Sequence, residues 1–258
     1  MQRTIRAIVK ESPFGSFAGA VYRSSLRLSR NIAREITQKD QKRIKKYMAQ
    51  HEVKKLHIGC GNNILDCWLN GDYSPQTSGV IYIDATKTFP FRDETFDFVF
   101  SEHMIEHIPY AKGNNMLRES FRVLKNGGRI RITTPDLAFL ISLYRADKSE
   151  LQKEYIWRSP QLFPDIYPLG QDTFIINGFV RAWGHEFIYD EKVLRHSLEA
   201  AGFKEITSLD LNKSEIAELN ELENERRMPA GFLQLESFTL EGIKRVTRES
   251  ASNERQGI

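Results

Sequence analysis

The chain has 258 residues, 40% of them hydrophobic, and a formal net charge of +3, which is enough for one main domain with extensions. No run of about 18 apolar residues predicts a membrane-spanning helix, and the N-terminus lacks the continuous apolar stretch of a secretory signal. Two cysteines, Cys60 and Cys67, are too few for a disulfide framework and wrongly placed for a zinc ribbon, so we expect a cytoplasmic protein.

Residues 1–52 are predicted to form a basic helical extension. Residues 1–55 contain 14 Lys/Arg and 4 Asp/Glu, a net charge of +10, whereas the rest of the chain carries −7. Apolar residues recur here at roughly helical spacing, namely Leu26, Ile32, Ile36, Ile44, Tyr47 and Met48. An amphipathic helix that covers the protein's own core, or docks on a second subunit, is the first interpretation. Peripheral contact with an anionic surface such as the inner membrane is the second. Nucleic acid is disfavoured because no aromatic residues alternate with the basic ones.

After this extension, short apolar segments alternate with amphipathic ones. The predicted strands are 53–58, 68–72, 80–85, 96–100, 129–134, 203–211 and 232–246, and the predicted helices are 110–125 and 190–201. The last two strands are expected to pair as an antiparallel hairpin, and residues 247–258 to form a flexible tail. This alternation indicates an α/β fold, in which a mostly parallel sheet carries helices on both faces and binds its ligand beyond the carboxyl ends of its strands.

The first predicted strand stops at a glycine-rich loop that points to a cofactor site. Gly59, Cys60 and Gly61 follow this strand, and the missing Cβ atoms let the backbone turn tightly and approach a ligand. Asp72 ends the second strand, where a carboxylate can accept both hydroxyls of a ribose. Asp84 lies at the end of the third, where it can accept a hydrogen bond from an adenine amino group. The loop and the two acids together predict a nucleoside clamp.

Three cofactors carry such a nucleoside: a nicotinamide dinucleotide, a nucleoside triphosphate and S-adenosylmethionine. The dinucleotide fingerprint needs Gly or Ala where this chain has Ile64, and an acid about 20 residues on, whereas Asp72 follows Gly59 by 13 residues. A triphosphate loop needs Gly-Lys-Ser/Thr, which does not occur. A cofactor without phosphates fits best, and this favours S-adenosylmethionine.

Residues 55–135 resemble the class I S-adenosylmethionine-dependent methyltransferases, specifically the methyltransferase type 11 group of bacterial enzymes. The matching pieces are LHIGCGN from Leu56, NGD from Asn70, Asp84 with TFPF from Thr88, FDFV from Phe96, SEHMIEH from Ser101 and LKNGGR from Leu124. The resemblance implies a methyltransferase domain over 53–246 with a Rossmann-like, doubly wound sheet of seven strands, mostly parallel with an antiparallel last strand. It also implies a cofactor site for S-adenosylmethionine formed by Gly59, Cys60, Gly61, Asp72, Asp84 and Ser101. In that site the two glycines lie under the methionine part, and Ser101 lies at the sheet edge.

The chain departs from the family pattern at two positions. His57 stands where an acid often precedes the first glycine, and Asn63 replaces the third glycine of the commonest Gly-x-Gly-x-Gly form. Neither change removes the clamp. The alternative is that the glycines only form a strand-to-helix turn, and the two acids in order argue against it.

Residues 147–189 break the alternation of strands and helices. This segment contains Pro160, Pro164, Pro168, Tyr155, Trp157, Phe163, Tyr167, Phe174, Phe179 and Trp183. Because it follows the fifth strand, it should overhang the cofactor pocket as a long aromatic loop that forms a lid or an acceptor-binding insertion. A packed excursion that covers a helix face is the alternative.

Methyl transfer from a sulfonium depends mainly on alignment of the acceptor and exclusion of water. A hydroxyl acceptor also profits from a general base, for which His107 and His185 are the candidates, with His103 and Glu106 close by in sequence. The resemblance implies a histidine at the place of His185, although a histidine that only caps the next helix is the alternative. We expect transfer to an oxygen of a small-molecule or glycan acceptor. A link to polysaccharide biosynthesis follows from the resemblance alone.

Two other functions stay open. His103, Glu106 and His107 also spell an inverted zinc-peptidase motif, which on a helix would place both histidines on one face. This reading explains nothing of the upstream clamp, and we predict no resident metal. The chain could also be a non-catalytic S-adenosylmethionine-binding module whose basic extension binds a partner.

Overall fold

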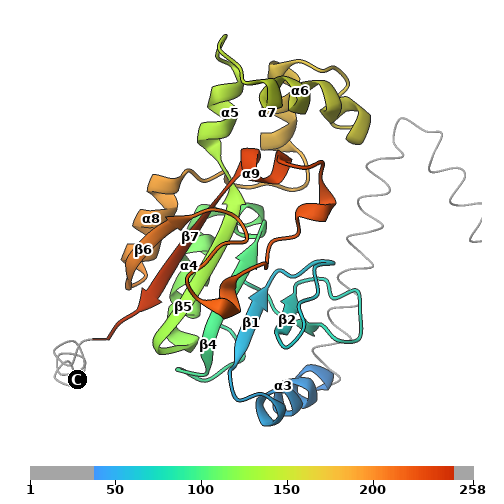
Figure 1. Ribbon diagram of the computed structural model, residues 1–258. Helices are drawn as coiled ribbons and strands as arrows, with labels where there is room; N and C mark the ends of the chain where they lie inside the picture. The colour runs from blue at the N-terminus through green and yellow to red at the C-terminus, as the bar shows by residue number, and fades with distance from the viewer. Residues whose placement is uncertain (1–37, 247–258) are drawn as a thin grey trace, which may run out of the picture.

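A seven-stranded sheet forms the centre of the molecule in the computed structural model, which describes residues 38–246 (Figure 1). The strands are β1 (Lys55–Ile58), β2 (Leu69–Asp72), β3 (Ile81–Tyr82), β4 (Phe96–Glu102), β5 (Leu124–Pro135), β6 (Phe203–Leu209) and β7 (Ser237–Lys244), in the spatial order β3-β2-β1-β4-β5-β7-β6. β7 is antiparallel to both of its neighbours, and the other six strands run parallel to one another. The predicted Rossmann-like α/β fold is therefore confirmed, including its antiparallel last strand.

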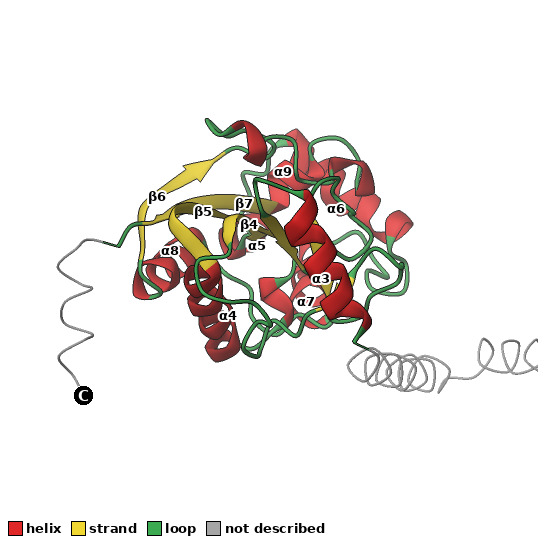
Figure 2. Ribbon diagram, turned by 90° about the horizontal axis from the view of Figure 1, so that it is seen from below, coloured by secondary structure: helices red, strands yellow, loops and turns green. Residues whose placement is uncertain are grey.

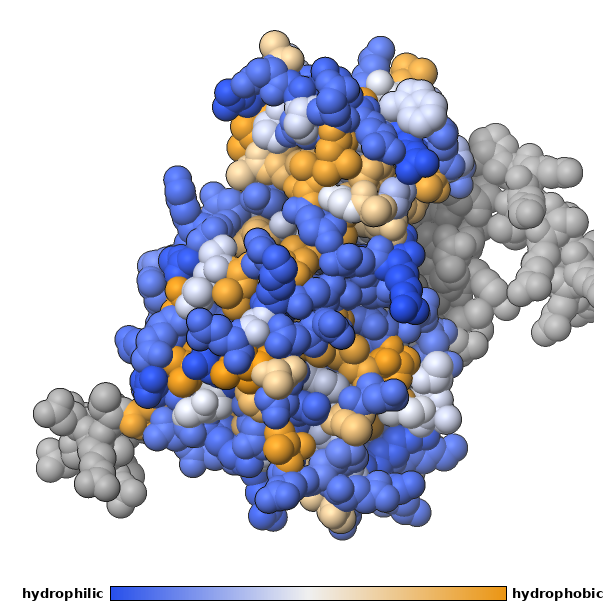
Figure 3. Space-filling view, in the orientation of Figure 1, coloured by the Kyte–Doolittle hydropathy of each residue, from blue (hydrophilic) through white to orange (hydrophobic). Residues whose placement is uncertain are grey.

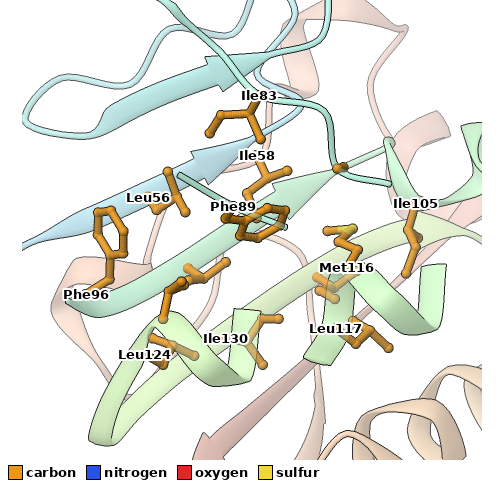
Figure 4. Packing of buried hydrophobic residues seen from close by; sticks show 14 of the residues in the cluster. Leu56, Ile58, Ile83, Phe89, Phe96, Ile105, Met116, Leu117, Leu124 and Ile130 are labelled. Carbon is orange, nitrogen blue, oxygen red and sulfur yellow. The ribbon is translucent and has the colours of Figure 1, made fainter. Parts of the chain in front are cut away.

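Two long helices cover one face of the sheet, close to where the sequence predicts them. They are α4 (Tyr110–Val123) and α8 (Glu191–Ala200). The side chain of Asp190 begins α8 by accepting a hydrogen bond from the amide of Val193 at 2.8 Å. Figure 4 shows Met116 and Leu117 of α4 packed toward strand residues such as Ile130. This face is a continuous apolar core.

The opposite face of the sheet is covered by the irregular segment 210–227. It contains two short 3-10 helices, η2 (Ala217–Leu219) and η3 (Glu225–Arg227). A small apolar cluster lies beneath it, formed by Trp68, Phe100, Leu219 and Leu222. Arg131 of β5, which alternates in direction with its apolar neighbours in the strand, is fully buried here beside Glu223 and Glu241.

The third and the last of the predicted strands are much shorter in the structure. The sequence predicts a strand over 232–246, whereas α9 (Phe232–Glu236) occupies the first part and β7 begins only at Ser237. Gly231 starts α9 with φ 81°, and the ring of Phe232 packs against Tyr155 at 4.9 Å. A short apolar run cannot be assigned to strand or helix from its periodicity alone. The third strand ends after Tyr82 because β3 is the edge of the sheet and has β2 as its neighbour on one side alone.

The helix α3 (Lys39–Gln50) lies within the predicted basic extension, at the amino ends of the strands (Figures 1 and 2). Tyr47 is buried, and its hydroxyl donates to the carbonyl oxygens of Lys55 and Cys67 at 3.0 and 3.1 Å. Several lysines of α3 are exposed. The predictions for residues 1–37 and 247–258 lie outside the described residues. Within residues 38–246, no helix combines the length and the apolar content needed to cross a membrane.

A helical unit stands beyond the carboxyl ends of the strands and includes most of the segment 147–189 (Figure 1). It consists of α5 (Leu137–Leu143), α6 (Glu150–Leu162) and α7 (Asp172–Arg181), together with α9. These helices enclose a second apolar cluster around Phe139, Tyr155 and Phe179. The expected long aromatic loop is therefore mostly helical, because its aromatic residues form a core of their own. Figure 3 shows hydrophobic residues on the surface of this unit in the upper part of the molecule.

Candidate active site

A cavity of about 1150 Å³ opens where the parallel strands end. Its walls come from the loop after β1, the ends of β2 and β3, the loop after β4, and the turn formed by Trp183 and Gly184. The glycine loop and His107 thus meet in one cavity, although they lie far apart in the sequence. Among the predicted site residues, Gly59, Gly61, Asp72, Asp84 and His107 line it.

The glycine loop is bent back toward β2. Gly59 has φ 71°, and its amide donates to the carbonyl oxygen of Gly71 at 2.8 Å. A Cβ at Gly59 would lie 2.1 Å from Cγ of Met104, so the loop after β4 closes on this position because it has no side chain. Gly61 has φ 50°, and its amide donates to Oδ2 of Asp72 at 2.9 Å. The loop and the first carboxylate are therefore fixed to each other.

The two strand-end carboxylates are both held by local hydrogen bonds. Oδ1 of Asp72 accepts from the amide of Ser74 at 2.6 Å. Oδ1 of Asp84 accepts from the amide and the hydroxyl of Thr86 at 3.0 and 2.6 Å, and Lys87 lies 3.1 Å from Oδ2. Burial alone would raise the pKa of Asp84, but these donors hold that pKa below its ordinary value. This end of the cavity therefore presents an ionised carboxylate.

Two predicted cofactor residues do not line the cavity. Cys60 is buried with its Sγ 3.7 Å from the carbonyl oxygen of Gly61, and burial raises the pKa of its thiol to about 12. Ser101 is also buried, and its hydroxyl has no hydrogen-bond partner among residues 38–246. The roles of both residues stay predictions.

His107 and His185 are brought together at the other end of the cavity. Their rings lie 4.8 Å apart, centre to centre. His107 lines the cavity, whereas His185 lies behind the turn of Trp183 and Gly184, which lines it and has φ values of 55° and 83°. The Nδ1 atom of His185 donates to the carbonyl oxygen of Phe179 at 2.6 Å. Burial lowers the pKa of both histidines, that of His107 to about 4.

The helix required by the zinc-peptidase reading is not formed. His103 has φ 45°, and only Ile105–His107 form a single 3-10 turn, η1. The Nε2 atom of His103 lies 2.7 Å from the hydroxyl of Ser237. This prediction is wrong in its geometry, since a 3-10 turn does not stack the first and fifth residues of the motif on one face.

Several cavity residues were not predicted from the sequence. Met104 closes over Gly59, and Tyr73, Ser74 and Gln76 follow Asp72 into the wall. The position of Tyr73 and Ser74 directly after a clamp carboxylate was a usable signal. Trp183 belongs to the aromatic segment 147–189 that was expected to overhang the pocket, and the turn after α7 decides which of its aromatic residues lines the cavity.

Comparison with known proteins gives a family for the central part of this chain. Residues 56–132 match the family described as "Methyltransferase domain". An uncharacterized protein of Methanocaldococcus jannaschii is 33% identical over 90 residues, which are 35% of this chain and about one third (33%) of that protein.

Solved structures with a similar fold include two S-adenosylmethionine-dependent methyltransferases. The one from Thermotoga maritima is 18% identical, with 90% of this chain and 98% of that chain covered and a TM-score of 0.45. The one from Archaeoglobus fulgidus is 15% identical, with 82% and 94% covered and a TM-score of 0.43. The family match at residues 56–132 contains the glycine loop and both strand-end carboxylates. Residues 56–132 of this chain therefore form a methyltransferase domain, as the resemblance to the class I S-adenosylmethionine-dependent methyltransferases predicts.

Proposed function

We propose that the protein transfers the methyl group of S-adenosylmethionine to an oxygen of a small-molecule or glycan acceptor. The observation that carries this proposal is the single cavity, which is lined by the glycine loop, by both carboxylates and by His107. A cofactor held by the loop and the carboxylates and an acceptor held beside His107 would meet inside it. Such alignment is the main requirement of methyl transfer.

The size of the cavity supports two ligands. Pockets for one drug-sized molecule usually measure about 300–1,000 Å³, whereas this cavity measures about 1150 Å³. The rim carries two partly exposed aromatic side chains, Tyr73 and Trp183, which are 50% and 43% exposed. The polar residues Ser74 and Gln76 line the same cavity. Flat aromatic faces beside hydrogen-bonding groups suit a polar ring such as a sugar.

The bound cofactor supplies a reactive methyl group on a sulfonium. At the acceptor end, His107 is neutral at pH 7 because burial lowers its pKa to about 4. A neutral imidazole has a free lone pair, so His107 can accept the proton of a hydroxyl acceptor. His185 supports this position through its ring contact with His107.

Asp72 provides the test of the cofactor end. We expect Asp72→Ala to weaken S-adenosylmethionine binding by about 1–3 kcal/mol, because a charge-assisted hydrogen bond is lost. Isothermal titration calorimetry measures this change. Asp66→Ala is the matched control, since Asp66 is exposed and does not line the cavity. Equal affinities of Asp72→Ala and the unchanged protein would contradict the ribose assignment.

A transfer screen tests the acceptor. Labelled cofactor is offered with nucleotide-sugars, glycolipids, peptides and small amines, and we expect label on a hydroxyl oxygen of a sugar-containing acceptor. Label on amines or peptides alone would overturn the acceptor class. Cofactor binding without any transfer would favour the non-catalytic module instead.

The proposal places the enzyme in the cytoplasm, with peripheral contact to the inner membrane through the basic residues 1–55. Lys42, Lys45 and Lys46 of α3 are exposed and support this contact. The full chain should sediment with anionic vesicles and release at high salt. Equal sedimentation with neutral vesicles would contradict an electrostatic contact.

A further inference from the structure

Three potential metal ligands converge at the histidine end of the cavity. Glu106, His107 and His185 each offer one ligand atom, and these atoms all lie within 4.8 Å of one another. Two of the residues come from η1 and the third from the turn before α8. This set differs from the motif read from the sequence, because His185 takes the place of His103.

The carboxylate of Glu106 has one oxygen without a hydrogen bond. Glu106 is fully buried, and its Oε2 accepts from the hydroxyl of Thr134 at 3.0 Å. Its Oε1 has no hydrogen-bond partner among the described residues. That oxygen faces Nδ1 of His103 at 3.6 Å and Nε2 of His107 at 3.8 Å. A buried carboxylate oxygen without a donor is costly, and a cation would satisfy it.

The histidines are oriented in the way that metal ligands usually are. Histidine ligands typically donate their other ring N–H to a carbonyl or carboxylate oxygen. His185 does this through Nδ1, which donates to the carbonyl oxygen of Phe179, and its Nε2 lone pair stays free.

Backbone hydrogen bonds hold the three ligands in place. The amides of Glu186 and Phe187 both donate to the carbonyl oxygen of Glu106, at 2.7 and 3.1 Å. These bonds fasten the segment that carries His185 to the turn that carries Glu106 and His107. The cluster therefore does not depend on flexible side chains alone.

We propose that Glu106 Oε1, His107 Nε2 and His185 Nε2 hold a divalent transition-metal cation. Two imidazoles and one carboxylate form a donor set known for zinc and non-haem iron, with further positions left open. Ligand atoms about 2.1 Å from a tetrahedral ion lie about 3.4 Å apart, so the side chains draw together by up to about 1.4 Å on binding. Of the three ligands, His107 lines the cavity.

An open position suits a ligand with an oxygen donor. A hydroxyl bound to such a cation has a lower pKa, so it can lose its proton to solvent water before its oxygen takes the methyl group. In this arrangement the two histidines hold the ion, and His107 does not act as the base proposed above. This last step rests on the proposed transfer to an oxygen. The cation site itself does not depend on it.

Cobalt and zinc binding test the site directly. The full chain carrying Cys67→Ser, which removes an exposed thiol, is titrated with Co²⁺ and Zn²⁺ by calorimetry and by visible absorption of bound Co²⁺. We expect one equivalent to bind. His107→Ala, His185→Ala and Glu106→Gln should each weaken binding more than about 10-fold, because even a residue outside the ligand set typically changes metal affinity 10- to 100-fold.

Two control variants sharpen the result. His196→Ala removes an exposed histidine on α8 and should leave binding unchanged. His103→Ala should also keep metal binding. If His103→Ala abolished metal binding and His185→Ala did not, the ligands would be His103, Glu106 and His107 of the sequence motif, and this proposal would be overturned. No binding by the parent protein, or equal binding by all variants, would overturn it as well.

Cofactor titration separates this inference from the proposed function. Each variant is first shown to unfold cooperatively and to bind S-adenosylmethionine like the parent. Methyl transfer by a protein that binds neither ion would refute the cation site and leave the function standing. Ion binding without methyl transfer to any hydroxyl would refute the proposed function and leave the cation site standing.

Discussion

The two faces of the sheet are covered by different physical means. On one face, apolar side chains of α4 and α8, such as Leu117 and Leu194, pack against the strands. On the other face, the irregular segment 210–227 covers buried charged residues of β5 and β7. A helix satisfies most of its backbone hydrogen bonds internally, so an apolar stripe is enough for it to pack on the sheet. A segment without regular structure needs partners for its backbone, and here the sheet supplies them.

The buried ion-pair cluster provides these partners. Arg131 contacts Glu223 and Glu241 at 2.7 Å each, and it also donates to the carbonyl oxygens of Lys213 and Asp210 in the covering segment. Glu223 accepts from the amide of Asn212 at 2.8 Å. The charged side chains therefore satisfy backbone groups of a segment whose regular structure is limited to two short 3-10 helices.

The same polar face reaches the cofactor loop. The side-chain amide of Asn63 donates to Glu102 at 3.2 Å and to the carbonyl oxygen of Leu222 at 3.1 Å. Glu102 in turn accepts from the amide of Asn224. Asn63 stands where the family pattern commonly has a third glycine. Its side chain ties the loop to the segment 210–227.

Breaking the ion-pair cluster should have the largest effect. We expect Arg131→Met to lower the free energy of unfolding by about 3–5 kcal/mol, because two buried carboxylates lose their partner. Urea unfolding measures the change. The triple variant R131M/E223Q/E241Q removes the charges together and should be more stable than the single variant. A loss below about 1 kcal/mol for Arg131→Met would show that the charges do not hold the covering segment.

A cavity on the apolar face should cost somewhat less. Leu117→Ala removes a fully buried side chain of α4 and should lower the free energy of unfolding by about 2–5 kcal/mol. The loss should be the same at low and high salt, since no charge is involved. A clear salt dependence of this loss would contradict the view that the two faces of the sheet are held by different interactions.

Acid should weaken the polar face through His57, and the effect should be the smallest of the three. His57 packs on Phe100 and hydrogen-bonds to Asn70 at 3.1 Å, and burial lowers its pKa from 6.5 to about 4. Between pH 6.5 and pH 4, His57 is protonated in the unfolded chain but stays neutral in the folded protein. The free energy of unfolding that is present above pH 6.5 is therefore lost as the pH falls toward 4. The loss is about 2–3 kcal/mol.

Comparison with His57→Gln isolates this histidine. Glutamine keeps a hydrogen-bonding group but does not titrate, so the stability advantage of the unchanged protein should shrink as the pH falls from 7 to 4. Parallel pH curves for the two proteins would refute the assignment of this acid sensitivity to His57.

Local patterns allowed much of the fold to be predicted. The helix starting at Tyr110 and the glycine loop at Gly59 depend on residues close in sequence, and both lie where the sequence places them. The prediction failed at α9, where contacts with the distant residue Tyr155 decide between helix and strand. The rival zinc-peptidase motif starting at His103, which the upstream clamp already disfavoured, needs an α-helix that the chain does not form.

The sequence by itself determined the order of the strands along the chain, the cofactor loop and the two carboxylates, because each follows from alternation, glycine content or position at a strand end. Tertiary structure alone decided that His185 meets His107 and Glu106, and that Arg131 is buried between Glu223 and Glu241. Contacts between segments far apart in the chain depend on how the sheet and its coverings pack. No local pattern of residues carries that information.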